Sequence, residues 1–271
     1  MRGKPSSVTR VIEAGIGRWL GAVIISGGVL WVSEAGEIDP RRIVFGSTDE
    51  FDAIKIFTPD GGKEPKVVYG DSRGILHVVQ PYRNGFKEEW ASSSLRSAIG
   101  EVFVEDINDD KAQDILCYTT RGKIYIFDTS TYRIVWQNMD SEYTSISCMT
   151  VANTDNDPQK EIVFFADQRL RVYDGKNRFE ELKSDQEYTG DDVPTDILVA
   201  DMDGDGGNEI VLNSGSVLDA RFFDVKWRSP DRFGEKLGAM DVDGDGILEL
   251  IGESDGKFIR VFDVDLRKEK L

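Results

Sequence analysis

The stretch Asp201-Met-Asp-Gly-Asp-Gly-Gly-Asn-Glu209 places acidic side chains at its positions 1, 3, 5 and 9 and continues directly into the apolar pair Ile210-Val211. The same design recurs in Asp241-Val-Asp-Gly-Asp-Gly-Ile-Leu-Glu249, Asn153-Thr-Asp-Asn-Asp-Pro-Gln-Lys-Glu161 and Asp106-Ile-Asn-Asp-Asp-Lys-Ala-Gln-Asp114. The ninth residues of the four loops, in chain order, lie 47, 48 and 40 positions apart. A period in this range is typical of repeat architectures. The sequence therefore predicts a fold that repeats one unit introduced by an acidic loop.

Each acidic loop can surround one cation. Oxygen atoms at positions 1, 3, 5 and 9 suit Ca²⁺, and glycine at positions 4 and 6 lets the backbone curl round the ion. Several carboxylates held close together repel one another unless a cation neutralises them. Mg²⁺ suits these loops less well because it demands tight octahedral geometry. The predicted Ca²⁺ ligands are Asp201, Asp203, Asp205, Glu209, Asp241, Asp243, Asp245, Glu249, Asn153, Asp155, Asp157, Glu161, Asp106, Asn108, Asp110 and Asp114.

The four loops differ in how completely they match this design. The loops at 201 and 241 carry every ligand, and the loop at 153 has Asn153 first and Pro158 in place of a glycine. The loop at 106 has Asn108 at position 3 and Lys111 in place of a glycine, so predicted affinity falls in that order. An EF-hand would need Glu at position 12, which Leu212 occupies, and a helix beyond it. A metal-free turn rich in Asp and Gly is the alternative.

The residues after each loop predict β-strands. A β-rich run is followed by a turn and a second run that ends in aspartate, with Ile124–Asp128, Leu170–Asp174, Ala220–Asp224 and Ile259–Asp263 as the four copies. A strand with an aromatic residue comes next, for which Trp90, Trp136, Phe179 and Trp227 are the candidates. A further apolar strand leads into the next loop. Four antiparallel strands in each period of this length are typical of a β-propeller blade.

Fainter copies of the unit extend the series toward the N-terminus, before Val67 and Val29. We therefore predict an all-β, six-bladed propeller that occupies residues 1–271 as a single domain, with five or seven blades as alternatives. We expect residues 7–14 to supply the last strand of the final blade and so close the ring. The predicted repeats are 15–52, 53–93, 94–141, 142–186, 187–230 and 231–271 plus 7–14.

The apolar segment 19–32 has two interpretations. As part of residues 20–36 it aligns with residues 237–253 as a repeat that has lost its acidic loop, and it also has the features of a secretory signal peptide followed by a small-residue cleavage site. The segment is too short to span a membrane, and Gly27-Gly28 interrupts it. We expect no transmembrane span.

The acidic loop followed by an aliphatic pair resembles the FG-GAP/VCBS repeats of integrin-α-like β-propellers, and the resemblance covers nearly the whole chain. The loops at 201 and 241 match that family's Asp-x-Asp-x-Asp-Gly-x-x-Glu/Asp pattern at every ligand position. The resemblance implies that the loops bind Ca²⁺ between adjacent strands of a blade. It also implies that a face of the propeller serves as a docking surface for another macromolecule.

Composition narrows the function. The chain has 33 Lys and Arg against 50 Asp and Glu, a net charge of −17, which disfavours nucleic acid as a partner. His77 is the only histidine, and neither a nucleophile elbow nor zinc-site spacing occurs, so we predict that the chain is not an enzyme. Cys117 and Cys148 are predicted to be buried thiols, with a disulfide between them as the alternative.

We expect a calcium-binding module that binds a protein partner or scaffolds a larger assembly, in an extracytoplasmic compartment where calcium is abundant. The alternative is a carbohydrate-active propeller, either a lectin or a polysaccharide lyase or hydrolase, because paired carboxylates are also the residues of glycoside hydrolysis. Aromatic residues in connecting segments could stack on a glycan or pack between blades, and the candidates are Tyr82, Phe86, Tyr143 and Tyr188.

Overall fold

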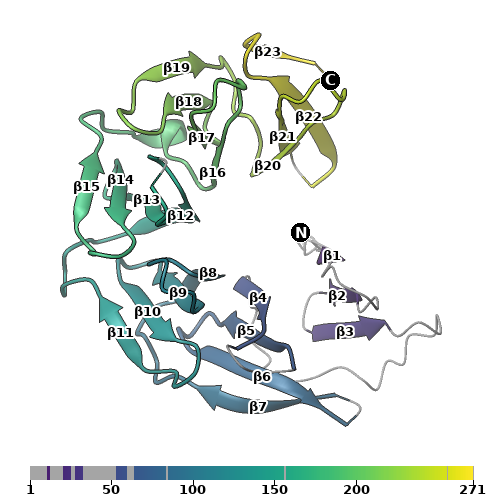
Figure 1. Cartoon of the computed structure of the whole chain (residues 1–271), viewed down its shortest axis with the longest axis vertical. Coiled ribbons are helices and arrows are strands. Elements are labelled where there is room, and N and C mark those ends of the chain that lie inside the picture. The colour runs from purple at the N-terminus through teal and green to yellow at the C-terminus, as the bar shows by residue number, and fades with distance from the viewer. Residues whose placement is uncertain are drawn as a thin grey trace, which may run out of the picture. The chain divides into compact units, whose positions relative to one another are not determined.

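The computed structural model describes residues 53–59, 64–83, 85–155, 157–254 and 256–270, together with the backbone of residues 11–12, 21–25 and 28–32. The chain divides into two compact units, Met1–Ile99 and Gly100–Leu271. The described residues form antiparallel β-sheets and one short 3-10 turn at Gly190–Asp192 (Figure 1). The predicted all-β class is confirmed. Among the described residues, no helix is long and apolar enough to cross a membrane.

The described residues of the first unit form two sheets. The smaller sheet has the order β1-β2-β3, with strands Val11–Ile12, Gly21–Ile25 and Gly28–Val32. The hairpin of β2 and β3 is the arrangement that the blade interpretation of residues 19–32 predicts. The larger sheet has the order β4-β5-β6-β7, with strands Ala53–Phe57, Lys66–Gly70, Leu76–Tyr82 and Gly85–Ala91.

The second unit contains four sheets of four strands each, which follow one another along the chain (Figure 1). Each sheet is a meander in which sequential strands are neighbours. β8–β11 are Ile99–Glu105, Asp114–Thr119, Ile124–Asp128 and Ile134–Gln137, and β12–β15 are Ile146–Ala152, Glu161–Ala166, Arg169–Asp174 and Glu180–Lys183. β16–β19 are Ile197–Ala200, Glu209–Leu212, Ser216–Asp219 and Val225–Arg228, and β20–β23 are Lys236–Met240, Glu249–Ser254, Phe258–Asp263 and Lys268–Glu269. Every acidic loop joins the first strand of its sheet to the second.

The core of the second unit lies between successive sheets. The second strands β9, β13 and β17 are buried along their whole length, and β13 and β17 pack side chains of both faces against neighbouring sheets of this unit. Three clusters of buried side chains result, with Phe164, Leu170 and Phe262 among their members. Cys117 and Cys148 are both buried free thiols, so the disulfide alternative is not realised. The acidic loops project from the ends of these buried strands.

The predicted closure by an N-terminal strand is wrong. The fourth strand of the last sheet is β23, where Glu269 pairs with Phe262 and Lys268 with Asp263. A bidentate ion pair between Arg260 and Glu269, with N–O distances of 2.8 Å, holds this edge. Val11–Ile12, the described part of the expected closing strand, pairs with β2 instead. The last sheet completes itself locally, because a short turn costs less chain entropy than recruiting a distant segment. The number of blades and the single domain stay predictions.

Two local strand predictions also need correction. Ala220–Asp224 is a turn, and the strand before it, β18, ends at Asp219, which pairs with Glu209. Phe179 precedes β15 and is half-exposed, and Leu182 takes the place that Trp90, Trp136 and Trp227 hold in other sheets. In both cases an aromatic residue that the sequence analysis expected in a strand lies outside that strand: Phe222 and Phe223 follow β18, and Phe179 precedes β15.

Candidate cation sites

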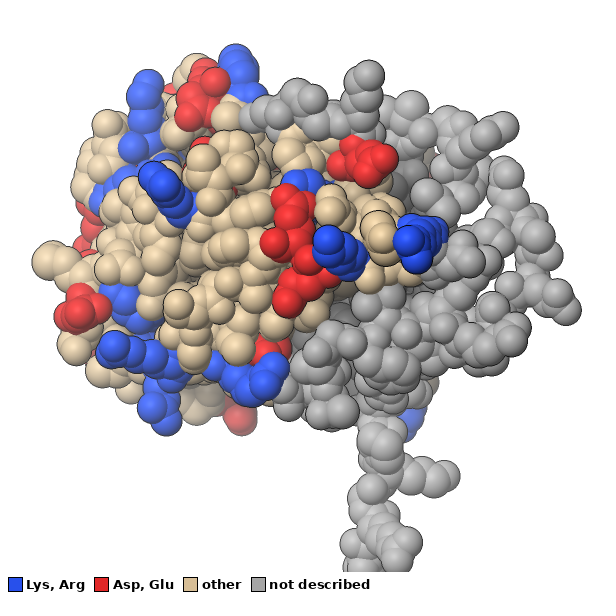
Figure 2. All heavy atoms as spheres, turned by 90° about the horizontal axis from the view of Figure 1, so that it is seen from below, with Lys and Arg blue, Asp and Glu red and all other residues tan. Residues whose placement is uncertain are grey.

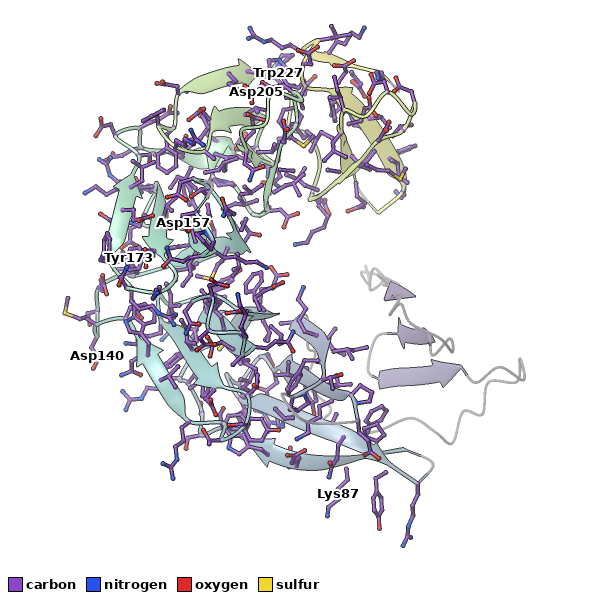
Figure 3. The ribbon with its side chains drawn as sticks, in the orientation of Figure 1. Lys87, Asp140, Asp157, Tyr173, Asp205 and Trp227 are labelled. Atoms are coloured by element: carbon purple, nitrogen blue, oxygen red, sulfur yellow. The ribbon has the colours of Figure 1, made fainter. Side chains whose placement is uncertain are left out.

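Carboxylate side chains gather in three of the four acidic loops. In each, three carboxylate groups have oxygen atoms that all lie within 4.8 Å of one another. The groups are Asp155, Asp157 and Glu161; Asp201, Asp203 and Glu209; and Asp241, Asp243 and Glu249. Figure 3 labels Asp157 and Asp205, the fifth residues of two of these loops, at the sheets β12–β15 and β16–β19. In the two groups at 201 and 241, the fifth residues, Asp205 and Asp245, are not among the converging carboxylates.

The loop at 201 is held in shape by its own backbone. Asp201 accepts hydrogen bonds from the N–H groups of Gly204 and Gly206 at 2.8 and 3.0 Å. Both glycines have positive φ angles, 73° and 86°, which glycine adopts without strain. Glu209 is fully buried, and its Oε2 accepts a hydrogen bond from the N–H of Met202 at 2.8 Å. One oxygen of Glu209 is therefore fixed by the fold, and Oε1 is left to face the loop.

The loop at 241 repeats this arrangement. Asp241 accepts from the N–H groups of Gly244 and Gly246 at 2.6 and 3.0 Å. Glu249 is 2% exposed, and its Oε2 accepts from the N–H of Val242 at 2.7 Å. The identical spacing of glycines and carboxylates in the two sequences produces the same local geometry.

The loop at 153 keeps the ninth residue and changes the first. Glu161 is 2% exposed, and its Oε2 accepts from the N–H and hydroxyl of Thr154 at 2.6 and 3.1 Å. The Nδ2 of Asn153 donates to the backbone carbonyls of Asp157 and Gln159, so this side chain acts as a brace for the loop. Burial raises the pKa of Glu161 to about 7, and the charges of Asp155 and Asp157 act in the same direction. This loop concentrates negative charge around a buried carboxyl group.

The loop at 106 does not form such a group. Asp106 accepts from the backbone N–H groups of Asp110 and Lys111, at 3.2 and 3.0 Å, and Asn108 points its Nδ2 at Asp110 Oδ2, at 3.0 Å. An amide N–H group cannot ligate a cation. The side chain of Asn108, at position 3, therefore presents a donor to Asp110 where a ligand oxygen would be needed. Burial raises the pKa of Asp114 to about 6, against the opposing charge of Arg178. The predicted set of four ligands is not brought together here.

Two lysines that the sequence analysis missed enter the other sites. Lys226 Nζ lies 2.9 Å from Asp203 Oδ2, 3.2 Å from Asp205 Oδ2 and 2.6 Å from Glu209 Oε1. Lys270 Nζ lies 2.9 Å from Asp243 Oδ2, 2.6 Å from Glu249 Oε1 and 3.5 Å from Asp263 Oδ2. These contacts raise the pKa of both ammonium groups. Neither lysine belongs to a loop, so the loop motif alone gives no sign of it.

The donor sets fit Ca²⁺ to different degrees. All three carboxylate groups supply the hard oxygen atoms that Ca²⁺ prefers. At 201 and 241 an ammonium group lies among those oxygens, and Ca²⁺ would have to displace it. Among the described residues, no lysine or arginine forms an ion pair with Asp155, Asp157 or Glu161. The loop at 153 therefore offers the best fit to a free divalent cation.

A cleft of about 380 Å³ adjoins the loop at 153. Its walls include Asp155 and Thr154 from the loop, Glu181 and Leu182 from β15, and Arg221 and Phe222 from the turn after β18. Arg221 donates from Nη2 to the backbone carbonyl of Asp155 at 3.4 Å. Phe222 is 71% exposed at the mouth. Acidic, basic and aromatic groups thus meet at one concave surface beside the candidate site.

The other residues that the sequence singled out have surroundings of their own. His77 is buried, stacks on Tyr69 with ring centroids 4.8 Å apart, and places Nδ1 2.8 Å from Glu88 Oε1. Tyr143 and Tyr188 are 5% and 3% exposed, so they pack between strands rather than face a ligand. Tyr82 is exposed.

Comparison with solved structures shows similarity of fold. The chain is similar to Sqt1 of Saccharomyces cerevisiae, with a TM-score of 0.68 and 14% identity over 93% of this chain and 70% of that one. It is similar to the computationally designed Ika8 protein, with a TM-score of 0.65 and 13% identity over 96% and 73% of the two chains. It is similar to BBS1N, crystallised in complex with ARL6DN, with a TM-score of 0.58 and 13% identity over 81% and 66%.

These likenesses show a propeller-like fold, since Sqt1 and BBS1N are propeller-like proteins. A scan against protein-family models gave no match, and a search of curated proteins gave none either.

Proposed function

We propose that this chain is a non-catalytic, propeller-type scaffold that binds a protein partner and holds Ca²⁺ in acidic loops of its second unit. The observation that carries the calcium part is the convergence of three carboxylate groups, each within 4.8 Å, in three loops of the second unit. Carboxylates so close together are stabilised in their charged form by a cation. We also propose an extracytoplasmic location, because free Ca²⁺ is abundant there and extracellular calcium modules bind it with dissociation constants of roughly 10⁻⁴–10⁻³ M.

The proposal of a scaffold rather than an enzyme is supported by the surroundings of the histidine and cysteine side chains, which are packed or buried. The His77 ring is packed against Tyr69 and hydrogen-bonded to Glu88. Burial raises the pKa of the Cys117 thiol to about 12, so it is not available as a thiolate nucleophile. The carboxylates that could serve glycoside hydrolysis are those of the candidate cation sites.

A protein partner is supported by the surface around the cleft at 153. Aromatic and arginine side chains are the residues that most often dominate binding energy at protein interfaces, and Phe222 and Arg221 lie together here. The exposed ring of Phe222 is large for a solvated position. On the face shown in Figure 2, acidic and basic side chains are interspersed rather than gathered into one basic region, an arrangement that suits a protein better than a polyanion.

The calcium part is tested by titrating the full chain with Ca²⁺ in an isothermal calorimeter. We expect saturable binding, and an absence of heat up to about 5 mM would contradict the proposal, because this exceeds the range of extracellular calcium modules.

The scaffold part is tested by affinity capture from the native source, with Ca²⁺ present, using the chain and its Phe222→Ala variant. Phe258→Ala is the matched control, since Phe258 is also exposed, at 62%, but lies on β22. We expect a defined protein to be retained by the wild type and the control and lost by Phe222→Ala. Capture that all three share would contradict the role of this surface, and capture of a polysaccharide would favour the carbohydrate alternative.

A further inference from the structure

Strand register brings one residue of the outermost strand to each acidic loop. In the sheet β16–β19, Ile210 follows the ninth loop residue and pairs with Leu218, which in turn pairs with Val225. The next residue, Lys226, lies at a β-bulge, because the pairing resumes at Val217 and Trp227. A bulge inserts one extra residue and re-aims its side chain. The Lys226 side chain returns across the sheet to Glu209 Oε1 at 2.6 Å.

The same path can be followed in the other four-stranded sheets. It starts at the residue after position 9 or its equivalent, on the second strand. It then passes to that residue's partner on the third strand and to the partner of that residue on the fourth strand, and it ends one residue later in the sequence. The ninth-position residue and the residue reached are Glu249 and Lys270, Glu161 and Glu181, Asp114 and Val135, and Lys66 and Glu89; the last three pairs end at a bulge, and Lys270 directly follows β23. Lys270 is held in this place by its N–H, which donates to the carbonyl of Val261 at 2.7 Å.

Charge complementarity links the two places in three of these sheets. Glu209 meets Lys226 and Glu249 meets Lys270, each at 2.6 Å. In the sheet β4–β7, the acidic loop is missing and the signs are exchanged: Lys66 meets Glu89, also at 2.6 Å. The exchange shows that the two places are neighbours whatever their charge. In these three sheets the residue at position 9 therefore meets an opposite charge, whereas Val135 of the sheet β8–β11 offers no charge to Asp114.

The sheet β12–β15 breaks this rule, since both places carry glutamate. Glu181 lines the same cleft as Asp155, and the charges of Asp174, Asp155 and Asp157 add to burial in raising its pKa. Arg221 is the basic residue that faces the cleft, and it bonds to the backbone of Asp155. Where the sheets at 201 and 241 supply an ammonium group, this sheet supplies a further carboxylate.

We propose that Lys226 and Lys270 are built-in counter-ions that take the cation position of the loops at 201 and 241, and that the loop at 153, with Glu181, takes the free divalent cation. This reverses the order of affinity that the loop motifs predict. Only the second half of the proposal depends on the proposed calcium function. An ammonium group tethered to the adjacent strand is always present beside its carboxylates, so free Ca²⁺ must compete with it.

The test measures Ca²⁺ stoichiometry by equilibrium dialysis with the full chain and four variants. The wild type should bind one Ca²⁺ per chain. Glu181→Lys should weaken that site by at least about tenfold, since it changes the local charge by two units. Lys226→Met should add a second site, and Lys270→Met does the same independently at 241. Lys257→Met is the control, because Lys257 is an exposed lysine in the turn before β22, and it should leave the count unchanged.

Thermal melting in chelator separates this proposal from the calcium function. Without metal, Lys226→Met should melt several degrees below the wild type and Lys257→Met should not, because buried Glu209 loses its counter-ion; added Ca²⁺ should restore the variant. If no form binds Ca²⁺ and Lys226→Met still melts early, the calcium function fails and the counter-ion role stands. Two or more sites in the wild type with no change in Lys226→Met and Lys270→Met would overturn the proposal, as would an unchanged melting temperature.

Discussion

At the scale of single residues, the second unit uses fixed hydrogen bonds to hold carboxylates that would otherwise repel one another. In the loops at 153, 201 and 241, the Oε2 of the ninth-position glutamate accepts a hydrogen bond from a backbone N–H of its own loop. The donors are Thr154, Met202 and Val242. This bond orients Oε1 toward the other carboxylates. Whether that oxygen meets an ammonium group or remains open to a free cation then depends on a single side chain in the outermost strand.

Asp71 shows the same use of a carboxylate in a sheet without an acidic loop. It is 1% exposed and accepts from the N–H groups of Ile75 and Arg73 at 2.7 and 3.0 Å. Burial pushes the pKa of Asp71 upward, but the hydrogen bonds from Ile75 and Arg73 and the charge of Arg73 outweigh it and hold the pKa below its ordinary value of 3.8. A depressed carboxyl pKa contributes stability above the unfolded value, and this stability is lost as the pH falls through the folded pKa.

We expect Asp71→Asn to reduce the free energy of unfolding at pH 7 by about 1–3 kcal/mol, because buried donors lose a charged acceptor. Urea unfolding at pH 7 and at pH 3 measures this. The difference between variant and wild type should shrink at pH 3, where the wild-type carboxyl becomes protonated. An equal difference at both pH values would contradict the assigned cause.

At the scale of strands, the sheets of the second unit are joined by aromatic contacts. Trp227 of β19 lies 5.1 Å from Phe233 and 6.3 Å from Phe262 of β22, measured between ring centroids. Phe233 and Phe262 meet at 5.0 Å with an interplanar angle of 70°, an edge-to-face arrangement. One cluster therefore contains residues of two consecutive sheets.

Trp227→Ala should destabilise the second unit by about 3–5 kcal/mol, because it removes a large side chain from the contact between these sheets. Chemical denaturation measures the loss. Trp136→Ala, at the same register place in β11, is the matched comparison, and its cost should fall in the same range. A cost for Trp227→Ala below about 1 kcal/mol, typical of surface positions, would show that the cluster does not join the sheets.

At the scale of the whole molecule, a cation that binds the folded chain alone raises its stability. One site at a free concentration of a hundred times the dissociation constant contributes about 2.7 kcal/mol. For a chain of this size, that corresponds to a rise in melting temperature of roughly 5–10 °C. We expect this rise when Ca²⁺ is added to chelator-treated protein in a thermal melt. Glu161→Gln, which keeps the shape and removes the charge, should abolish most of it, and a full response in that variant would contradict the site.

Glu209 and Lys226 meet in the same site, but the sequence predicted only Glu209. The loop motif predicted Glu209 as a ligand because glycine turns and carboxylate spacing act within nine residues. Lys226 lies 17 residues later and reaches Glu209 only through two strand pairings and a bulge. A search for lysine at that offset could have found it, but the same offset from Glu249 fails because the β21–β22 hairpin is longer: Leu250 and Phe262 pair across 12 residues, whereas Ile210 and Leu218 pair across 8.

The sequence by itself determined the repeat, the all-β class, the position of each acidic loop before a buried strand and the burial of both cysteines. These follow from periodicity and turn chemistry, which act between residues close in the chain. The tertiary structure alone decided that the last sheet supplies its own fourth strand and that ammonium groups enter two of the three carboxylate groups. The physical reason is that strand register and bulges, set by packing between sheets, choose which distant side chain meets each loop.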